Sequence, residues 1–345
     1  MMSSTVIVIS LSFIVMSSHP LVSGTVGALC TTDAITCGLC TVEPTQISPL
    51  NIVDCRYKNL TSVPKFAADP LSSTKVYYEL TLAGNLLQTI HSGAFVDIRF
   101  EKLDLSDNPL SSIEPLAFSG HGASLRRLFM SLTPSAEFPV NSLATLRNLS
   151  LLSVAGFLGF SLPTGALASL SALSELTIID GRLGKIEGED LISQENTLHQ
   201  LRLSGNALTG VPSSALEVAA KLTLLDLSTN RIQQVGPNAF GGHGAGAHIE
   251  SIDLSNNGLG GLIDRLAFND VAESLTVLRL KHCQLTDDSL ESLRPLRALR
   301  ELRLDFNSLT SLPNNLFDEM SALTFLSLNN NRSDFVYDMH GLINE

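Results

Sequence analysis

The sequence of 345 residues contains no tryptophan, and aromatic residues make up only 6% of it. Lysine and arginine together number 22 against 34 aspartate and glutamate residues, so the net charge is -12 at pH 7. A protein that binds nucleic acid needs clustered cations that displace counterions from the phosphates. The shortage of basic residues therefore argues against nucleic acid as a partner and favours an acidic, soluble surface.

The sequence also lacks an apolar run of the length that a transmembrane helix needs, about 20 residues. A shorter apolar stretch, residues 5–16, is followed by small residues. It predicts a secretory signal peptide over residues 1–28, cleaved after about 24 to 28 residues, although no Lys or Arg precedes Arg56. The alternative is an N-terminal strand of the domain. We expect an extracellular, secreted protein with no membrane span in this chain.

Cysteine is scarce, and four of the five cysteines cluster near the N-terminus: Cys30, Cys37, Cys40 and Cys55. In an oxidising compartment this clustering predicts two disulfide bonds in a cap over residues 29–76. Cys37 and Cys40 have the spacing of half a zinc site or of a redox pair, but no second such pair lies nearby. A disulfide cap is therefore favoured over a metal or redox centre.

Catalytic motifs are missing as well. No nucleophile elbow, zinc-protease motif, phosphate loop or dinucleotide fingerprint occurs in a suitable context. His243 and His248 lie in a glycine-rich loop without a carboxylate or thiol at ligand spacing, which predicts a solvated loop. The sequence indicates no cofactor and no metal, and we expect the protein not to be an enzyme.

A repeated pattern, L-x-x-L-x-L-x-x-N-x-L, is the strongest signal in the sequence. Clear copies begin at Leu198, Leu222 and Leu299. The central leucines alternate with other residues, which predicts strands with leucine on one face, and successive copies predict parallel strands. The ninth places fall at residues 85, 108, 133, 154, 181, 206, 230, 257, 283, 307 and 331, so the spacing stays between 21 and 27 residues. An asparagine at that place can satisfy backbone groups left unpaired at the turn.

These repeats resemble the extracellular leucine-rich-repeat family, whose units have about 24 residues. The resemblance implies an α/β solenoid, a curved horseshoe with a parallel sheet on its concave face and irregular or short helical segments on its convex side. We expect about eleven repeats over residues 77–345. No C-terminal cysteine cap follows them, so either the sequence is truncated or an atypical unit covers the open edge.

The cysteine cluster is similar to the N-terminal cap of this family, in which the first cysteine pairs with the third and the second with the fourth. The resemblance implies bonds between Cys30 and Cys40 and between Cys37 and Cys55. This sequence departs from the usual cap, because two residues rather than one separate the middle cysteines.

The fifth cysteine, Cys283, follows Lys281 and His282 and could be a reactive thiol. It occupies the ninth place of its repeat, where its side chain should point into the stack, whereas His282 should point outward. A buried thiol in apolar surroundings is inert. The repeat therefore favours a structural role for Cys283.

The outward residues of the strands are the candidate binding surface, because solenoids bind partners in their concavity. The repeat predicts that two sets face outward there. The apolar set is Phe129, Leu132, Leu152 and Ile179, and the charged set is Arg202, Asp226, Asp253, Arg279 and Arg303. The alternative for the charged set is cross-strand ion pairing, of Arg202 with Asp226 and of Asp253 with Arg279. Glycosylation sequons occur at Asn59, Asn148 and Asn331, and the first two are the stronger candidates.

We expect a secreted or cell-surface recognition protein that binds an extracellular protein or glycan by its concave face. Two alternatives remain open. The chain is faintly similar to the non-catalytic leucine-rich subunit of a secreted crustacean luciferase, which implies an accessory subunit of a secreted enzyme. It is also similar to ectodomains of the chaoptin and Toll-like kind, which implies a truncated receptor.

Overall fold

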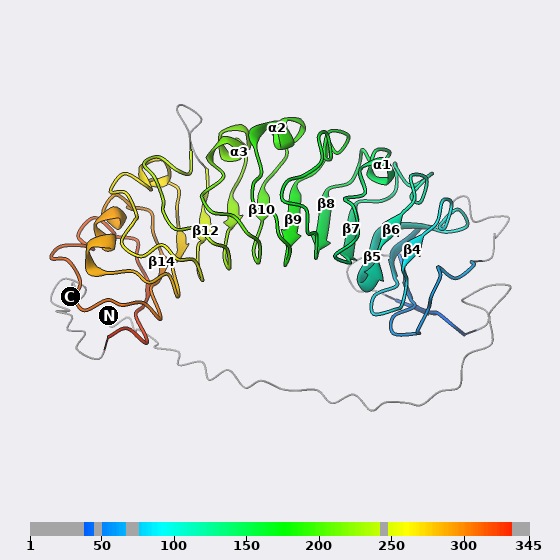
Figure 1. Cartoon of the computed structure of the whole chain (residues 1–345), viewed down its shortest axis with the longest axis horizontal. Coiled ribbons are helices and arrows are strands. Elements are labelled where there is room, and N and C mark those ends of the chain that lie inside the picture. The colour runs from blue at the N-terminus through cyan, green and yellow to red at the C-terminus, as the bar shows by residue number, and fades with distance from the viewer. Residues whose placement is uncertain (1–37, 45–49, 67–75, 242–247, 333–345) are drawn as a thin grey trace.

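The computed structural model describes residues 38–44, 50–66, 76–241 and 248–332. Over these residues the chain forms a curved solenoid, with strands on the inner side of the arc and loops and short helices on the outer side (Figure 1). The predicted horseshoe is confirmed. The predicted signal peptide, residues 1–28, lies outside the described residues, as do Cys30 and Cys37.

The inner face is one sheet of thirteen strands within the described residues. Its strands, in order, are β1 (Thr41–Glu43), β2 (Ile52–Asp54), β3 (Val76–Thr81), β5 (Arg99–Leu110), β7 (Arg127–Leu132), β8 (Leu151–Ala155), β9 (Glu175–Ile179), β10 (Gln200–Arg202), β11 (Leu224–Asp226), β12 (Ser251–Asp253), β13 (Val277–Arg279), β14 (Glu301–Arg303) and β15 (Phe325–Ser327). The pair β1 and β2 is antiparallel, and all later neighbours are parallel. Parallel pairing follows from the crossover that each return segment provides.

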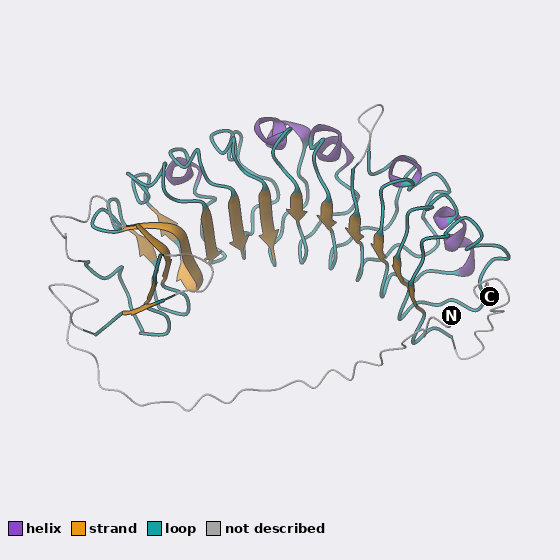
Figure 2. Ribbon diagram, turned by 180° about the vertical axis from the view of Figure 1, so that it is seen from behind, coloured by secondary structure: helices purple, strands orange, loops and turns teal. Residues whose placement is uncertain are grey.

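On the convex side, the described residues form only short elements (Figure 2). They are the helices α1 (Val140–Leu143), α2 (Gly188–Leu191) and α3 (Ser213–Val218), the 3₁₀ helices η1 (Ile192–Gln194), η2 (Asn269–Val271) and η3 (Asp287–Leu293), and the small parallel sheet of β4 (Thr89–Ile90) and β6 (Ser112–Ile113). Each return segment must connect the end of one strand to the start of the next across the convex side, and its helices have only three to seven residues. The predicted irregular convex side is confirmed.

The core lies between the sheet and the return segments. The fourth and sixth residues of the repeats, such as Leu201 and Leu203, are buried in every described repeat except the last, where Leu326 and Leu328 are partly buried. Phenylalanines enter from the return side: the rings of Phe240 and Phe268 stack with their centroids 5.2 Å apart. No unit could bury its leucines alone, so the stacking of units is what removes this surface from water.

The backbone is left-handed at the eighth place of every described repeat except the one that contains Leu132. Ten units share this conformation: Gly84, Asp107, Gly156, Asp180, Gly205, Thr229, Asn256, His282, Phe306 and Asn330 have φ between 53° and 78°. Glycine, asparagine and aspartate tolerate this region best, which explains their frequency at that place. His282 and Phe306 are bulky exceptions, and their rings stack with centroids 4.3 Å apart.

One repeat was misaligned in the sequence prediction. Val154 was assigned to the ninth place of its unit, but β8 pairs Leu152 with Leu128 and Ser153 with Phe129. Ser153 is therefore the fifth residue, and the ninth is the buried Phe157. With this correction the ninth places 133, 157 and 181 are spaced by 24 residues on both sides. Several alignments of this repeat place apolar residues at its core positions, because Leu149, Leu151, Leu152 and Val154 are all apolar. Only the backbone pairing of β8 with β7 decides between these alignments.

Candidate functional site

The concave face presents three columns of outward side chains, at the third, fifth and seventh places of each unit. The strand registers align the fifth places as Thr81, Asp104, Phe129, Ser153, Thr177, Arg202, Asp226, Asp253, Arg279, Arg303 and Ser327. All five predicted charged residues, from Arg202 to Arg303, thus share one column. They are half-exposed and can meet a ligand.

Two members of the predicted apolar set are not on this face. Leu152 is 0% exposed and Leu132 is 7% exposed, so both belong to the core. Leu152 was assigned outward because of the register error in its repeat, and Leu132 lies at the eighth place without the left-handed turn of the other units. Phe129 and Ile179 are half-exposed, as predicted.

The outward apolar residues of this region are Phe129, Leu151, Ala155 and Ile179, which we call the central patch. All four are half-exposed on β7, β8 and β9, and Ala155 is the register partner of Ile179. Sequence reasoning missed Leu151 and Ala155. The correct register would have found them, since they lie two residues on either side of Ser153.

The charged residues pair differently from the prediction. Arg202 lies 4.0 Å from Glu175, while Arg279 and Arg303 lie 3.1 Å and 2.7 Å from Glu301. Burial raises the pKa of the Glu301 carboxyl, but the hydrogen bond from Arg303 and the charge of Arg279 outweigh it and lower the pKa below its usual value.

The two aspartates of this column bind backbone instead of arginine. Asp226 accepts a hydrogen bond from the Ser228 amide at 2.9 Å, and Asp253 accepts one from the Ser255 amide at 2.8 Å. The predicted pairs of Arg202 with Asp226 and of Asp253 with Arg279 are therefore wrong. Each arginine reaches a glutamate at a third place, whose longer side chain can meet it.

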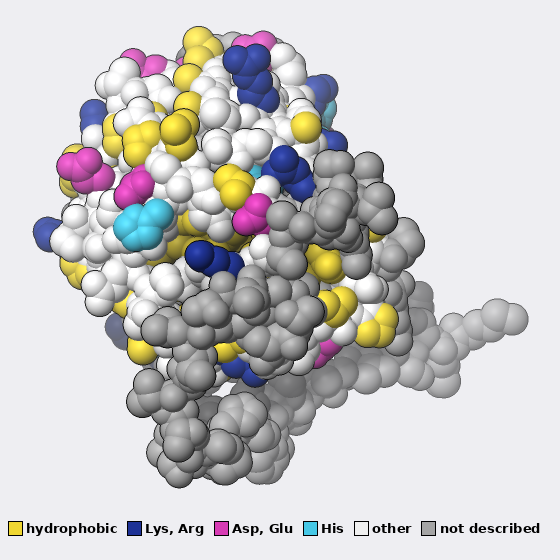
Figure 3. Space-filling model, turned by 90° about the vertical axis from the view of Figure 1, so that its right-hand side faces the viewer, with side chains coloured by type: hydrophobic (Ala, Val, Ile, Leu, Met, Phe, Trp, Pro, Cys, Tyr) yellow, Lys and Arg dark blue, Asp and Glu magenta, His cyan; other side chains and the backbone are white. Residues whose placement is uncertain are grey.

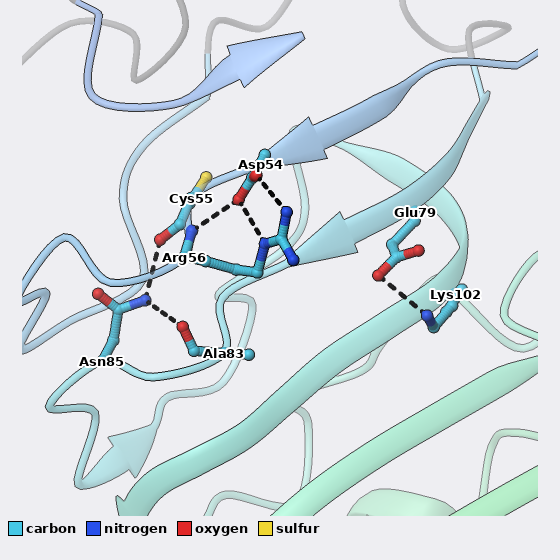
Figure 4. A network of polar contacts seen from close by, with 7 residues as sticks. All are labelled: Asp54, Cys55, Arg56, Glu79, Ala83, Asn85 and Lys102. Atoms are coloured by element: carbon cyan, nitrogen blue, oxygen red, sulfur yellow. Dashed lines mark hydrogen bonds and ion pairs between the residues drawn. The ribbon is translucent and has the colours of Figure 1, made fainter. Parts of the chain in front are cut away.

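Near the N-terminal end, short polar networks tie the first strands together (Figure 4). The Asp54 carboxylate lies 2.7 Å from the Arg56 guanidinium, whose hydrogen bond lowers the pKa of Asp54 despite partial burial. Lys102 lies 3.0 Å from Glu79 on the neighbouring strand. In a view onto this end, hydrophobic side chains of the described residues form separate groups among charged ones (Figure 3).

The ninth-place asparagines form a ladder that holds the turns together. The Asn257 amide donates to the Leu227 carbonyl of the preceding unit at 3.0 Å and to the Leu254 carbonyl of its own unit at 2.8 Å. Its oxygen accepts from the Ile232 amide at 3.0 Å. The same pattern recurs at Asn85, Asn108, Asn206, Asn230, Asn307 and Asn331.

Cys283 stands in this ladder, as the repeat predicts. Its side chain is fully buried, whereas His282 is exposed. The thiol donates weakly to the Leu254 carbonyl at 3.2 Å. Burial raises the pKa of Cys283 to about 12, so the thiolate needed for nucleophilic chemistry is scarce at neutral pH.

The disulfide connectivity differs from the one implied by the family cap. Cys40 is bonded to Cys55, with their Cα atoms 4.5 Å apart. This bond excludes both implied pairs, of Cys30 with Cys40 and of Cys37 with Cys55. The spacing of cysteines along the chain does not determine their pairing, and this chain has an unusual spacing between the middle two.

The two favoured sequons lie in different settings. Asn59 is exposed in a turn after β2. Asn148 is half-buried in the turn before β8, and its amide lies 3.5 Å from the Ala123 carbonyl. Asn331 is a ladder residue whose amide donates to the Leu328 carbonyl at 2.7 Å. Glycosylation at Asn59 and Asn148 stays a prediction.

Within the described residues, no group of three His, Cys, Asp or Glu side chains is arranged to hold a metal ion. No helix in the same part of the chain is long and apolar enough to cross a membrane. His248 is exposed, and His243 lies outside the described residues. The concave face presents apolar and charged columns of half-exposed side chains.

Comparison with known proteins identifies the repeats. One leucine-rich-repeat family model matches residues 196–259 and 273–332, and another matches residues 99–121. The chain carries leucine-rich repeats. Chaoptin of Drosophila melanogaster is 30% identical over 172 residues, covering 49% of this chain and 11% of chaoptin. Mouse Toll-like receptor 9 is 30% identical over 211 residues, covering 56% of this chain and 20% of the receptor.

This leucine-rich-repeat protein therefore matches only a small part of the length of these two relatives. Among solved structures, the LRIM1/APL1C complex is similar with a TM-score of 0.58 and 23% identity, covering 75% of this chain and 44% of that chain. At this identity the likeness shows the fold alone. The curved solenoid derived from the strand registers agrees with it.

Proposed function

We propose that this leucine-rich-repeat protein is an extracellular recognition module that binds a protein ligand across its concave face. The observation that supports the proposal is the central patch, which is apolar and half-exposed on three adjacent strands. Arginines Arg202, Arg279 and Arg303, further along the same face, are already paired with glutamates. An apolar centre with a polar rim is typical of interfaces, and paired rim charges are not left without a partner on binding.

Two more specific functions differ in the assembly to which the chain belongs. Its matches to short segments of chaoptin and Toll-like receptor 9 support a place within a larger receptor. An accessory subunit of a secreted enzyme would instead copurify with a catalytic chain in a fixed ratio. Both alternatives use the same concave face, so one experiment on that face addresses them together.

The test is affinity capture from extracellular fluid with the secreted chain and two matched variants. Ser153→Arg introduces a bulky charge between Phe129 and Thr177 in the fifth column, and Ser161→Arg makes the same change at an exposed residue outside the sheet. We expect Ser153→Arg to weaken capture of the ligand at least about tenfold, as for the centre of an interface, and Ser161→Arg to leave it unchanged. Equal capture by both variants contradicts the proposal.

A further inference from the structure

A small pocket lies in the N-terminal half of the concave sheet, beside the central patch, where β5 and β7 begin. Its volume is about 140 Å³, and it is lined by Tyr78, Glu101, Lys102, Arg126, Arg127 and Ser150. Three cations thus converge in a chain whose net charge is -12. Such a local excess of positive charge against the sign of the whole chain is a feature of anion-binding sites.

Two of these cations differ from the other arginines of the face. Arg202, Arg279 and Arg303 are each paired with a glutamate. Among the described residues, Arg126 and Arg127 have no carboxylate partner. Both are exposed, so their guanidinium groups are available to a ligand.

Aromatic rings hold the cations in place. Arg127 Nη1 donates to the Tyr78 hydroxyl at 2.8 Å across β5, and its guanidinium carbon lies 6.0 Å from the Tyr78 ring centroid. Lys102 Nζ lies 5.1 Å from the centroid of Phe129 and 3.0 Å from Glu79. A cation already ordered against a ring loses less conformational freedom when it binds an anion.

The other side chains that line the pocket restrict the class of ligand that it can bind. Glu101 adds a negative charge to the lining of the pocket, which disfavours phosphates and polyanions, as does the acidity of the whole chain. Glu101 and the Ser150 oxygen can accept hydrogen bonds from hydroxyl groups. A guanidinium fork matches a carboxylate in geometry. We infer that this pocket binds a carboxylate-bearing sugar, such as a uronic acid or a sialic acid at the end of a glycan.

In this arrangement Arg127 and Arg126 bind the carboxylate, and Glu101 and Ser150 bind the ring hydroxyls. The inference rests on the proposed role of the concave face in recognition and adds a glycan subsite to it. The pocket borders the turn that carries Asn148, because Arg126 Nη1 lies 3.5 Å from the Asn148 carbonyl. A glycan on Asn148 itself could compete for the pocket, so Asn148→Gln protein is the starting material for the test.

The test is titration of the full chain with glucuronic acid and N-acetylneuraminic acid, followed by calorimetry or ligand-observed NMR. Glucose, inorganic sulfate and a glutamate-rich peptide serve as comparison probes. We expect both sugar acids to bind and glucose to bind at least about tenfold more weakly, because a charge-assisted hydrogen bond to the carboxylate is lost. Arg127→Gln should weaken sugar-acid binding by a similar factor, and the control Arg297→Gln, which alters a paired arginine outside the sheet, should not.

Equal binding of glucose, or unchanged binding by Arg127→Gln protein with an unaltered melting temperature, overturns the inference. Tighter binding of the acidic peptide than of either sugar acid also overturns it and assigns the pocket to a peptide. These titrations need no protein partner. Sugar-acid binding together with failed protein capture would therefore refute the proposed protein-binding function alone, and the reverse result would refute the pocket alone.

Discussion

Replacing Cys283 with asparagine should stabilise the solenoid, because Cys283 is a gap in the asparagine ladder. Wherever asparagine stands at the ninth place, its oxygen accepts from an amide of the preceding unit, as Asn257 does from Ile232. At Cys283 the corresponding amide is that of Leu259, which is fully buried and has no acceptor within the described residues. An asparagine at this position would supply one.

The magnitude follows from these contacts. A buried amide without a partner costs about 1–3 kcal/mol, and a hydrogen bond contributes about 0.5–1.5 kcal/mol net. The new side chain would also donate to the carbonyls of Leu254 and Leu280, in place of the weak thiol contact with Leu254. Burial of the polar amide offsets part of the gain. We expect the free energy of unfolding of Cys283→Asn protein to rise by about 1 kcal/mol.

The assay is urea unfolding of three variants under identical conditions. The reverse exchange, Asn257→Cys, leaves the Ile232 amide without its acceptor and should lower the free energy of unfolding by about 1–3 kcal/mol. Cys283→Lys places a charge in the apolar stack and should prevent stable folding. A loss of stability in Cys283→Asn as large as that in Asn257→Cys would refute the ladder reasoning. Native Cys283 should also label slowly, because with a pKa of about 12 only about one thiol in 10,000 is ionised at pH 8.

Three further predictions concern the N-terminal half. Reduction of the bond between Cys40 and Cys55, which closes a separation of 15 residues, should lower the free energy of unfolding by about 3 kcal/mol, measured by urea unfolding with and without reductant. Burial lowers the pKa of His121 in the fold, so its contribution is complete above about pH 6.5 and is lost as the pH falls below that value; thermal melts from pH 7.5 to 5 should show a loss that His121→Gln reduces. Secreted protein should begin after about residue 24 to 28, and N-terminal sequencing that starts at Met1 would contradict the predicted signal peptide.

The fold could be predicted from the sequence because the spacing of the leucines determines it. A strand with leucines at the fourth and sixth places can bury them only against neighbouring copies, and this leaves one architecture. The register of the unit around Leu152 was not predictable in the same way. Leu151 and Leu152 are equally apolar, so the pattern does not say which of them faces inward, and the backbone pairing with Leu128 decides it.

The candidate site was predicted as a face but not in its contacts. The alternative interpretation paired Arg279 with Asp253. Arg279 instead reaches the longer side chain of Glu301, because Asp253 binds the Ser255 amide. The pocket at Arg127 was missed because Tyr78 lies 49 residues earlier in the chain and meets it only across an intervening strand. The left-handed backbone at the eighth places could have been predicted, because glycine, asparagine and aspartate recur there.

Apart from Cys283, the asparagine ladder is interrupted at residues 133, 157 and 181, where threonine, phenylalanine and glycine take the ninth place. At these three places no asparagine side chain links the turn to the preceding unit, as Asn108 and Asn206 do on either side. These turns follow β7, β8 and β9, the strands that carry the central patch. The arc is therefore expected to bend most easily beneath the patch, so that its radius can adjust to the curvature of a bound ligand while the ends of the solenoid stay rigid.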